Sequence, residues 1–377
     1  MDKIRIGIIG VGQIGKVHLD ACKQIPDVEV VAICGRTMEN LEYCAKNWNI
    51  PHVYQDYREL LKRDDIDAVD VCLHNNLHAP VTIAAFEAGK HVYCEKPIAG
   101  SYADGAAMLE AAKRFGKKLF IQLTFIHKTE VRAAKRLIDG NALGEIYHAR
   151  SKGFRRRNRP YVDGYGTADF VKKELSGGGA IYDMAVYHIG ELLFLMGLPK
   201  PLRMSGKLYQ KTGMDEERRA LSGFDVDELA VGFIHFENGV TMDIFESWAV
   251  HLDKFDSSCI LGSKGGVKLD PFSFHTTLCD LELDCTGDLD KMDERWHSTI
   301  KNEYAFSSWK SHGSNLLVAP ETHWVAALRG EVELLPTAQV TLDTMLIQEG
   351  ICLSDALGRE VTAEEVISAS KSTAVNI

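Results

Sequence analysis

The chain has 377 residues, of which 45% are hydrophobic and 25% charged, which is the composition of an ordinary globular protein. This length favours two domains, and the net charge of −10 argues against nucleic acid as the main partner. No apolar run reaches the roughly 18–20 residues of a membrane span, so we expect no membrane partner. Nine cysteines are scattered without metal-site spacing, which predicts reduced thiols, a cytoplasmic location and no metal site.

The first 124 residues alternate short apolar runs with helix-forming segments. The predicted strands are 4–9, 28–33, 68–73, 91–94 and 119–123. The predicted helices are 16–24, 37–48, 78–88 and 101–115. Repeated strand–helix units of this length predict a doubly wound parallel sheet, so we interpret residues 1–124 as a Rossmann dinucleotide-binding domain.

After residue 124 the pattern changes to longer alternating segments. A helix is predicted over 130–139, and strands over 146–152, 202–209, 229–237, 240–248 and 258–261. Asn238-Gly239, between two of these strands, is a strong hairpin signal. With helices at 321–328 and 341–356, the segment 125–377 is predicted to form an α/β domain with an open, mostly antiparallel sheet.

A glycine-rich loop joins the first predicted strand to the first helix. It reads GxGxxG, with Gly10, Gly12 and Gly15 as the glycines and Gln13 and Ile14 before the last of them. Such glycines allow a tight turn, close approach of the backbone to a pyrophosphate, and close helix–strand packing. The free N–H groups at the helix start would then bind the diphosphate of a dinucleotide.

The end of the second predicted strand bears on which nicotinamide cofactor binds. An NAD site usually has a carboxylate there for the adenosine ribose, whereas this chain has Gly35, followed by Arg36 and Thr37. Arg36 could pair with a 2′-phosphate, which favours NADP. Arg36 could instead stack on adenine, so NAD stays open.

Two further motifs identify a family. Gly89–Pro97 reads Gly-Lys-His-Val-x-x-Glu-Lys-Pro, and 177–183 reads Gly-Gly-Gly-Ala-Ile-Tyr-Asp, with Tyr187 and His188 just beyond. Together with the glycine loop, in this order and spacing, they resemble the glucose–fructose oxidoreductase/inositol dehydrogenase/MocA family. The resemblance implies a Rossmann domain, an open-sheet α/β domain, and a homodimer or homotetramer.

The family also implies an activity. We expect an NAD(P)-dependent oxidoreductase that acts on a carbinol or ketone of a sugar, cyclitol or sugar derivative. Some relatives are glycosidases that use tightly held NAD⁺ for transient oxidation and elimination, and this is the alternative.

The resemblance assigns roles to residues around the Glu-Lys-Pro motif. Lys96 would be the active-site lysine, flanked by Glu95 and by Pro97, which follows in a cis bond. Asn75 would lie near the cofactor diphosphate, and His78 matches a family histidine. Leu73-His74 replaces the Thr-Pro that usually precedes the asparagine, so the loop shape there differs from the family pattern.

The glycine block at 177–179 precedes the expected acid–base residues. Asp183 and Tyr187 are spaced i, i+4 and would share one helix face. Many relatives have histidine at the second position, whereas this chain has Tyr187 there and His188 about 100° further round a regular helix. Hydride transfer needs a cation for the developing alkoxide and a group that exchanges a proton. We assign these roles to Lys96 and to Tyr187, with His188 as the alternative. Asp183 would orient the substrate or hold the lysine's partner.

Further candidates lie on the substrate side. The basic loop 155–159 would suit an anionic substrate group, or else pairs with acidic surface. The strand-end residues Trp248, His251, Asp253 and Lys254 could line a sugar pocket or simply be edge positions. His323 and Trp324 could reach the pocket from a late helix.

Overall fold

The computed structural model of the chain describes residues 3–253, 255–292 and 319–375, which divide into two compact units. Unit 1 contains the described residues up to 122 together with 319–339 and 371–375, and unit 2 contains the rest. The predicted second domain, 125–377, therefore differs from unit 2. The chain returns to unit 1 because Trp324 packs against Tyr93 and Phe120, and Thr373 hydrogen-bonds Asp104.

Unit 1 is built on a parallel sheet of six strands in the order β3-β2-β1-β4-β5-β6. The strands are β1 (Ile4–Ile9), β2 (Val28–Cys34), β3 (His52–Tyr54), β4 (Ala68–Val71), β5 (His91–Cys94) and β6 (Leu119–Ile121). This order confirms the predicted Rossmann sheet, whose direction of winding reverses between β1 and β4. Ligands of such sheets bind at this point, beyond the carboxyl ends of the strands.

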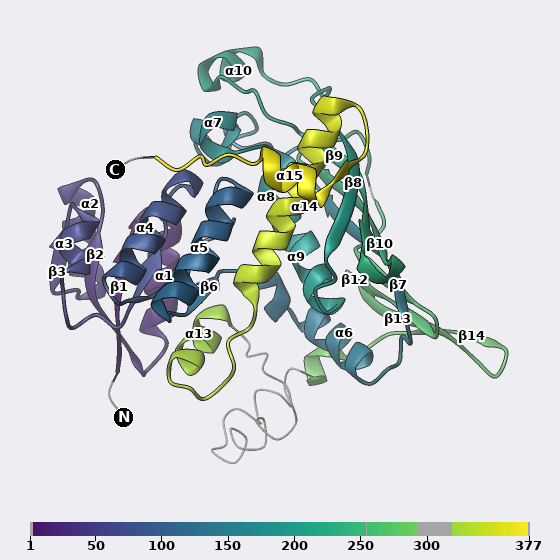
Figure 1. Cartoon of the computed structure of the whole chain (residues 1–377), viewed down its shortest axis with the longest axis horizontal. Helices are drawn as coiled ribbons and strands as arrows, with labels where there is room; N and C mark the ends of the chain where they lie inside the picture. Colours follow the sequence, from purple (N-terminus) through teal and green to yellow (C-terminus); the bar gives the residue numbers. More distant parts are fainter. Residues whose placement is uncertain (1–2, 254, 293–318, 376–377) are drawn as a thin grey trace. The chain divides into compact units, whose positions relative to one another are not determined.

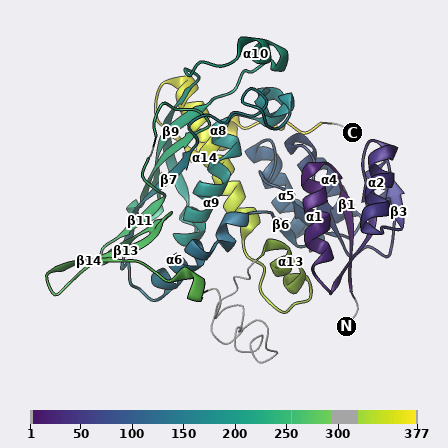
Figure 2. The same ribbon diagram turned by 180° about the vertical axis from the view of Figure 1, so that it is seen from behind.

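Helices cover both faces of this sheet. They are α1 (Gln13–Lys23), α2 (Met38–Trp48), α3 (Tyr57–Leu61), α4 (Asn75–Glu87), α5 (Tyr102–Phe115) and α13 (Pro320–Leu328). Figures 1 and 2 show α1 on one face and α4 and α5 on the other. The Ser101 side chain caps α5 by accepting a hydrogen bond from Asp104 N, and Gly116, at φ 62°, ends it.

Unit 2 contains a sheet of nine strands in the order β14-β13-β12-β11-β7-β10-β9-β8-β15. Its strands are β7 (Ile146–Phe154), β8 (Pro201–Tyr209), β9 (Leu229–Phe236), β10 (Thr241–Ser247), β11 (Cys259–Gly262), β12 (Gly265–Leu269), β13 (Phe272–Leu278), β14 (Leu281–Cys285) and β15 (Val361–Thr362). Of these strand pairs, β7 and β10 run parallel and the others antiparallel, which confirms the predicted mostly antiparallel sheet. The Asn238-Gly239 hairpin between β9 and β10 is present, and both residues have positive φ.

The helices of unit 2 include long ones that pack on the sheet and short ones in its connections. They are η1 (Thr124–His127), α6 (Thr129–Asp139), η2 (Ala168–Val171), α7 (Lys173–Ser176), α8 (Ala180–Asp183), α9 (Ala185–Leu195), α10 (Glu216–Ser222), α14 (Thr337–Leu357) and α15 (Ala363–Ala369). In Figure 1, α9 and α14 run along one face of the sheet. Glycines on β8 and β9 admit α14 closely, because a Cβ at Gly206 or Gly232 would lie 2.7 Å from Ile351 side-chain atoms. Among the described residues, no helix combines the length and apolar character needed to cross a lipid bilayer.

Among the buried acidic side chains of unit 2, Glu191 has the pKa that burial raises most clearly. Glu191 on α9 is 4% exposed, and burial raises its pKa to about 7 although His188 and Lys128 favour the charged form. It lines a cavity of about 270 Å³ that is also bordered by Phe125, Lys128 and His188. A carboxyl with a raised pKa stabilises the fold most below its unfolded pKa, and this contribution is lost as the pH rises through 7.

We predict that Glu191→Gln raises Tm several degrees at pH 8 and changes it little at pH 5. The neutral amide avoids a cost of burying charge that the shift from 4.5 to about 7 sets at about 3 kcal/mol. Thermal unfolding at both pH values measures the effect, with the exposed Glu282→Gln as the control. An equal change of Tm at the two pH values would contradict the assignment.

Candidate active site

The glycine loop after β1 is fixed by two close backbone approaches in unit 1. Gly10 has φ 102°, and a Cβ on it would lie 2.2 Å from the Cys72 carbonyl oxygen. A Cβ on Gly15 would lie 2.0 Å from the Gly10 carbonyl oxygen. Neither position accepts a side chain, so the turn and the packing of α1 on the strands both require glycine.

Gly12, the middle glycine of the loop, has no close neighbours. A Cβ at Gly12 would meet no atom within 4 Å, and Gly12 to Ile14 are exposed at the start of α1. No side chain caps this helix, so its first N–H groups remain available for an outside acceptor. An open glycine at an uncapped helix start fits the diphosphate of a dinucleotide.

The segment after β2 presents the basic residue expected near the adenosine end. Arg36 is exposed, its carbonyl accepts a hydrogen bond from Gln55 Nε2 at 2.9 Å, and no carboxylate within the described residues pairs with its guanidinium. Thr37 is the N-cap of α2 and makes no side-chain cap bond. A Cβ at Gly35 would lie 3.1 Å from Val11 Cγ2, so the position where NAD enzymes carry a carboxylate is tight here.

The Glu-Lys-Pro motif follows β5, two strands from β1 at the same edge of the sheet. Lys96 is half-buried, and the Lys96–Pro97 bond is cis, as the family resemblance implies. Glu95 is buried and accepts hydrogen bonds from the Lys96 backbone N–H at 3.0 Å and from His18 Nε2 at 2.9 Å. Glu95 thus supports the motif from within the fold.

Asn75 and His78 both lie on α4, where Asn75 is the first residue. His78 is fully buried, with Nδ1 2.9 Å from the Pro97 carbonyl and Nε2 3.1 Å from the Leu73 carbonyl. Burial lowers the pKa of His78, while both neighbouring carbonyl oxygens can accept a hydrogen bond from the ring. The structure places His78 as a link between two loops of the site rather than at its surface.

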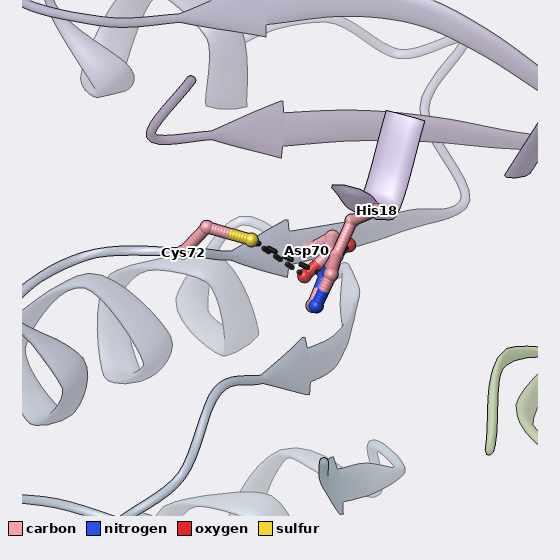
Figure 3. A group of neighbouring side chains, drawn as sticks. All are labelled: His18, Asp70 and Cys72. Atoms are coloured by element: carbon pink, nitrogen blue, oxygen red, sulfur yellow. Dashed lines mark hydrogen bonds and ion pairs between the residues drawn. The ribbon is translucent and has the colours of Figure 1, made fainter. Parts of the chain in front are cut away.

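A buried cluster behind the motif was not predicted from the sequence. His18 on α1, Asp70 on β4 and Cys72 just after β4 turn their side chains toward one another (Figure 3). His18 Nδ1 lies 2.8 Å from Asp70 Oδ2 and 3.2 Å from Cys72 Sγ. The available signal was Asp70, a charged residue inside an otherwise apolar strand.

In unit 2, Asp183 receives side chains from two strand ends. Its Oδ2 accepts a hydrogen bond from Trp248 Nε1 at 3.0 Å and lies 3.7 Å from Arg155 Nη1, which also donates to the Tyr165 hydroxyl at 2.6 Å. Because β7 and β10 are parallel with Phe154 opposite Ser247, the residues that follow them emerge side by side. The parallel pairing therefore brings Arg155 and Trp248, from two distant segments, to the same side chain, Asp183.

Tyr187 and His188 take different directions from the helix that carries them. A break at Met184 separates α8 from α9, so the segment is not one regular helix. Tyr187 is half-buried and stacks on Phe125 with ring centroids 4.6 Å apart. His188 turns to the sheet, where Nδ1 lies 3.0 Å from Glu246 Oε2, and Glu246 accepts a second bond from Ser151.

The His188–Glu246 pair also explains a glycine on β7. A Cβ at Gly153 would lie 1.8 Å from Glu246 Oε2 and 2.8 Å from the His188 ring, so the pair fills that space. Burial opposes a charge on His188, but Glu246 raises its pKa overall. His188 is therefore held on the sheet-facing side of α9 by its pairing with Glu246.

Several residues that were candidates for substrate contact are paired with carboxylates or exposed to solvent. Arg157 and Arg159 pair with Asp163 at 3.1 and 2.8 Å, and Arg159 also binds Glu228 at 2.9 Å, so this part of the basic loop is neutralised by its own carboxylates. His251 and Asp253 are exposed, and Lys254 lies outside the described residues.

The predicted late helix is present as α13, but its His323 and Trp324 are buried in the core of unit 1. His323 Nε2 accepts a hydrogen bond from Leu335 N at 3.0 Å. Trp324 packs on Tyr93 and Phe120, as part of the core of that unit.

The predicted site residues thus fall into two groups. The glycine loop, Arg36 and Lys96 belong to unit 1, whereas Asp183, Tyr187 and His188 belong to unit 2. Each group is assembled within its own unit by the contacts given above.

Family models match both parts of the chain. Residues 4–123 match an oxidoreductase family with an NAD-binding Rossmann fold, and residues 131–268 match the GFO/IDH/MocA C-terminal domain. Among curated proteins, D-glucoside 3-dehydrogenase of Escherichia coli is 28% identical over 281 residues, covering 72% of this chain and 79% of that protein. Myo-inositol 2-dehydrogenase of Thermotoga maritima is 28% identical over 194 residues, covering 52% of this chain and about half, 55%, of that protein.

A solved structure shares the fold. Levoglucosan dehydrogenase, in complex with NADH and levoglucosan, superposes with a TM-score of 0.76 at 21% identity, covering 96% of this chain and all of that one. This confirms the Rossmann domain followed by an open-sheet domain. From the matches of both family models and the motifs placed above, the chain belongs to the GFO/IDH/MocA family of NAD-binding oxidoreductases.

Proposed function

We propose that this oxidoreductase interconverts a carbinol and a ketone of a sugar, cyclitol or sugar derivative, with NADP or NAD as its cofactor. The observation that carries the proposal is the position of Lys96. It is half-buried directly after β5, at the edge of the sheet where the glycine loop leaves an open helix start after β1. Ligands of this sheet topology bind at that edge.

The chemistry divides among the chain's own residues. The nicotinamide, when bound, supplies the acceptor or donor of the hydride. The Lys96 ammonium stabilises the negative charge that develops on the substrate oxygen, and the Tyr187 hydroxyl exchanges its proton. Asp183, held by Trp248 and Arg155, orients the substrate hydroxyls. Tyr187 is favoured over His188 because the imidazole already pairs with Glu246.

The relatives support a redox role on sugars and cyclitols. Two of them act as a D-glucoside 3-dehydrogenase and a myo-inositol 2-dehydrogenase. Neither these proteins nor any contact among the described residues favours the glycosidase alternative.

We predict that Lys96→Ala lowers kcat about 100- to 1,000-fold, because it removes the cation that faces the developing oxyanion. Dinucleotide affinity should stay within about tenfold, a change of at most about 1.4 kcal/mol. A panel of sugars, inositols and their keto forms, followed at 340 nm with both cofactors, first identifies a substrate. The exposed Lys113→Ala serves as the control. Retained kcat in Lys96→Ala would refute the role of this lysine.

The proton-exchange assignment predicts a difference between two neighbours. Tyr187→Phe keeps the ring on Phe125 but removes the hydroxyl, and should lower kcat about 100-fold. His188→Gln breaks the pair with Glu246 and should lower Tm more than kcat. Steady-state kinetics and thermal unfolding of both variants measure these changes in kcat and Tm. The reverse pattern, with His188→Gln inactive but stable, would transfer the role to His188.

NADP is the cofactor that Arg36 favours. Its guanidinium is exposed, and no carboxylate in the described part of the chain occupies it. We predict that Arg36→Ala lowers kcat/KM for NADP about 10- to 100-fold and leaves that for NAD nearly unchanged, because a charge-assisted hydrogen bond to the 2′-phosphate is lost. Arg58→Ala, which removes an arginine already paired with Asp56, controls for net charge. An unchanged NADP/NAD ratio would contradict this assignment.

The proposal also covers the oligomeric state and the cellular location of the protein. We expect a homodimer or homotetramer, supported by apolar groups on the sheet face turned away from α9, such as Phe233 and the stacked pair Phe245 and Phe255. The nine cysteines are all free, which supports a reducing, cytoplasmic location.

A further inference from the structure

The imidazole of His18 lies between two carboxylates in the interior of unit 1. Nδ1 is 2.8 Å from Asp70 Oδ2, and Nε2 is 2.9 Å from Glu95 Oε1. The ring is fully buried, and both acids are less than 10% exposed. The two carboxylates come from different parts of the sheet, since Asp70 lies on the central strand β4 and Glu95 directly follows β5.

Hydrogen-bond accounting fixes the protonation of this group. An ionised carboxylate only accepts, so a ring that bridges two of them must carry a proton on each nitrogen. Cys72 completes the arrangement, because its thiol donates to Asp70 Oδ1 at 3.4 Å and burial keeps its pKa well above the ordinary value. Burial disfavours charge on His18, but Asp70 and its hydrogen bond raise the pKa of the ring far above 6.5. Glu95 responds in the opposite sense, with a pKa lowered by His18 in spite of burial.

Glu95 connects His18 to the backbone of Lys96. One carboxylate oxygen is held by His18, and the other accepts the Lys96 backbone N–H at 3.0 Å. His18 lies on α1, the same helix whose first turn forms the open end of the glycine loop. One side chain therefore connects the dinucleotide helix to the backbone of the Glu-Lys-Pro motif.

We propose that His18 is a positioning residue whose doubly protonated ring holds the Glu95 carboxylate, so that Glu95 fixes the backbone of Lys96. The proposal rests on the role given to Lys96 under the proposed function. It assigns the buried imidazolium a part in the reaction that acts through Glu95, without contact with substrate or cofactor.

The surroundings of the ring keep its charge state constant. The other titratable groups that face it are Cys22 on α1, Tyr93 on β5 and Glu321 on α13. Burial raises the pKa of each, so Cys22 and Tyr93 stay neutral across the physiological range. None of these three groups is a base, and the other cation that lowers the pKa of Glu95 is Lys96 itself.

The charge state is tested by NMR on the full chain labelled with ¹⁵N-histidine. The His18 signals are those lost in His18→Gln. We expect both ring nitrogens to remain protonated from pH 6 to pH 9. In Glu95→Gln one nitrogen should lose its proton, because an amide NH₂ donates where the carboxylate accepted. An ordinary titration of His18 near pH 6.5 would overturn the proposal. So would stoichiometric metal in the purified protein, since His18, Asp70 and Cys72 would then be ligands.

The positioning role is tested by kinetics on the same protein. His18→Gln should lower kcat about 10- to 100-fold, because small displacements of a reacting group have effects of this size. Dinucleotide affinity should change less than about threefold, or about 0.7 kcal/mol. His323→Gln, a buried histidine of the same unit, is the matched control and should lower Tm while kcat stays. An unchanged kcat in His18→Gln would overturn the role. If Lys96→Ala retained kcat, the proposed function would fail instead, and the NMR result would still decide the charge state of His18.

Discussion

The site depends on how closely three pieces of backbone approach one another in unit 1. The Cys72 carbonyl fills the space of a Cβ at Gly10, and the Gly10 carbonyl fills that of Gly15. These contacts hold the start of α1 against the ends of β1 and β4, where the winding of the sheet reverses. Gly12 then remains free of neighbours, with uncapped N–H groups beside it. The roles proposed for Arg36 and Lys96 rest on a dinucleotide bound at this end of α1.

In unit 2, strand pairing rather than close backbone contact brings distant residues together. One parallel pair within a mostly antiparallel sheet brings Arg155 and Trp248 to the same carboxylate, Asp183. On the buried face of the same two strands, Gly153 leaves room for the His188–Glu246 pair. Charged groups are thus fixed from both sides of the segment that carries Tyr187, which favours a rigid arrangement of the acid–base residues.

The sequence predicted what local chemistry determines. The glycine loop and the hairpin at Asn238 depend on residues within a few positions, and the parallel sheet on the repeated strand–helix units. The cis bond at Pro97 was implied by the family resemblance. Contacts between distant segments were missed. His18 meets partners 52 and 77 residues away, and nothing in a helix pattern identifies them. Likewise, the helix pattern around Trp324 does not show which unit it joins, and only the packing of Trp324 on Phe120 shows that the chain returns to the first unit.

The loop at Gly10–Gly15 is expected to hold a dinucleotide whose reactive end lies beside Lys96. A crystal structure grown with NADP⁺ or NAD⁺ tests it most directly. We expect the diphosphate on the first N–H groups of α1, over Gly12, and the Lys96 ammonium within about 3.2 Å of a polar atom of the nicotinamide or its ribose, the range of a direct hydrogen bond. A dinucleotide bound elsewhere, or a Lys96 side chain directed away from it, would contradict the account.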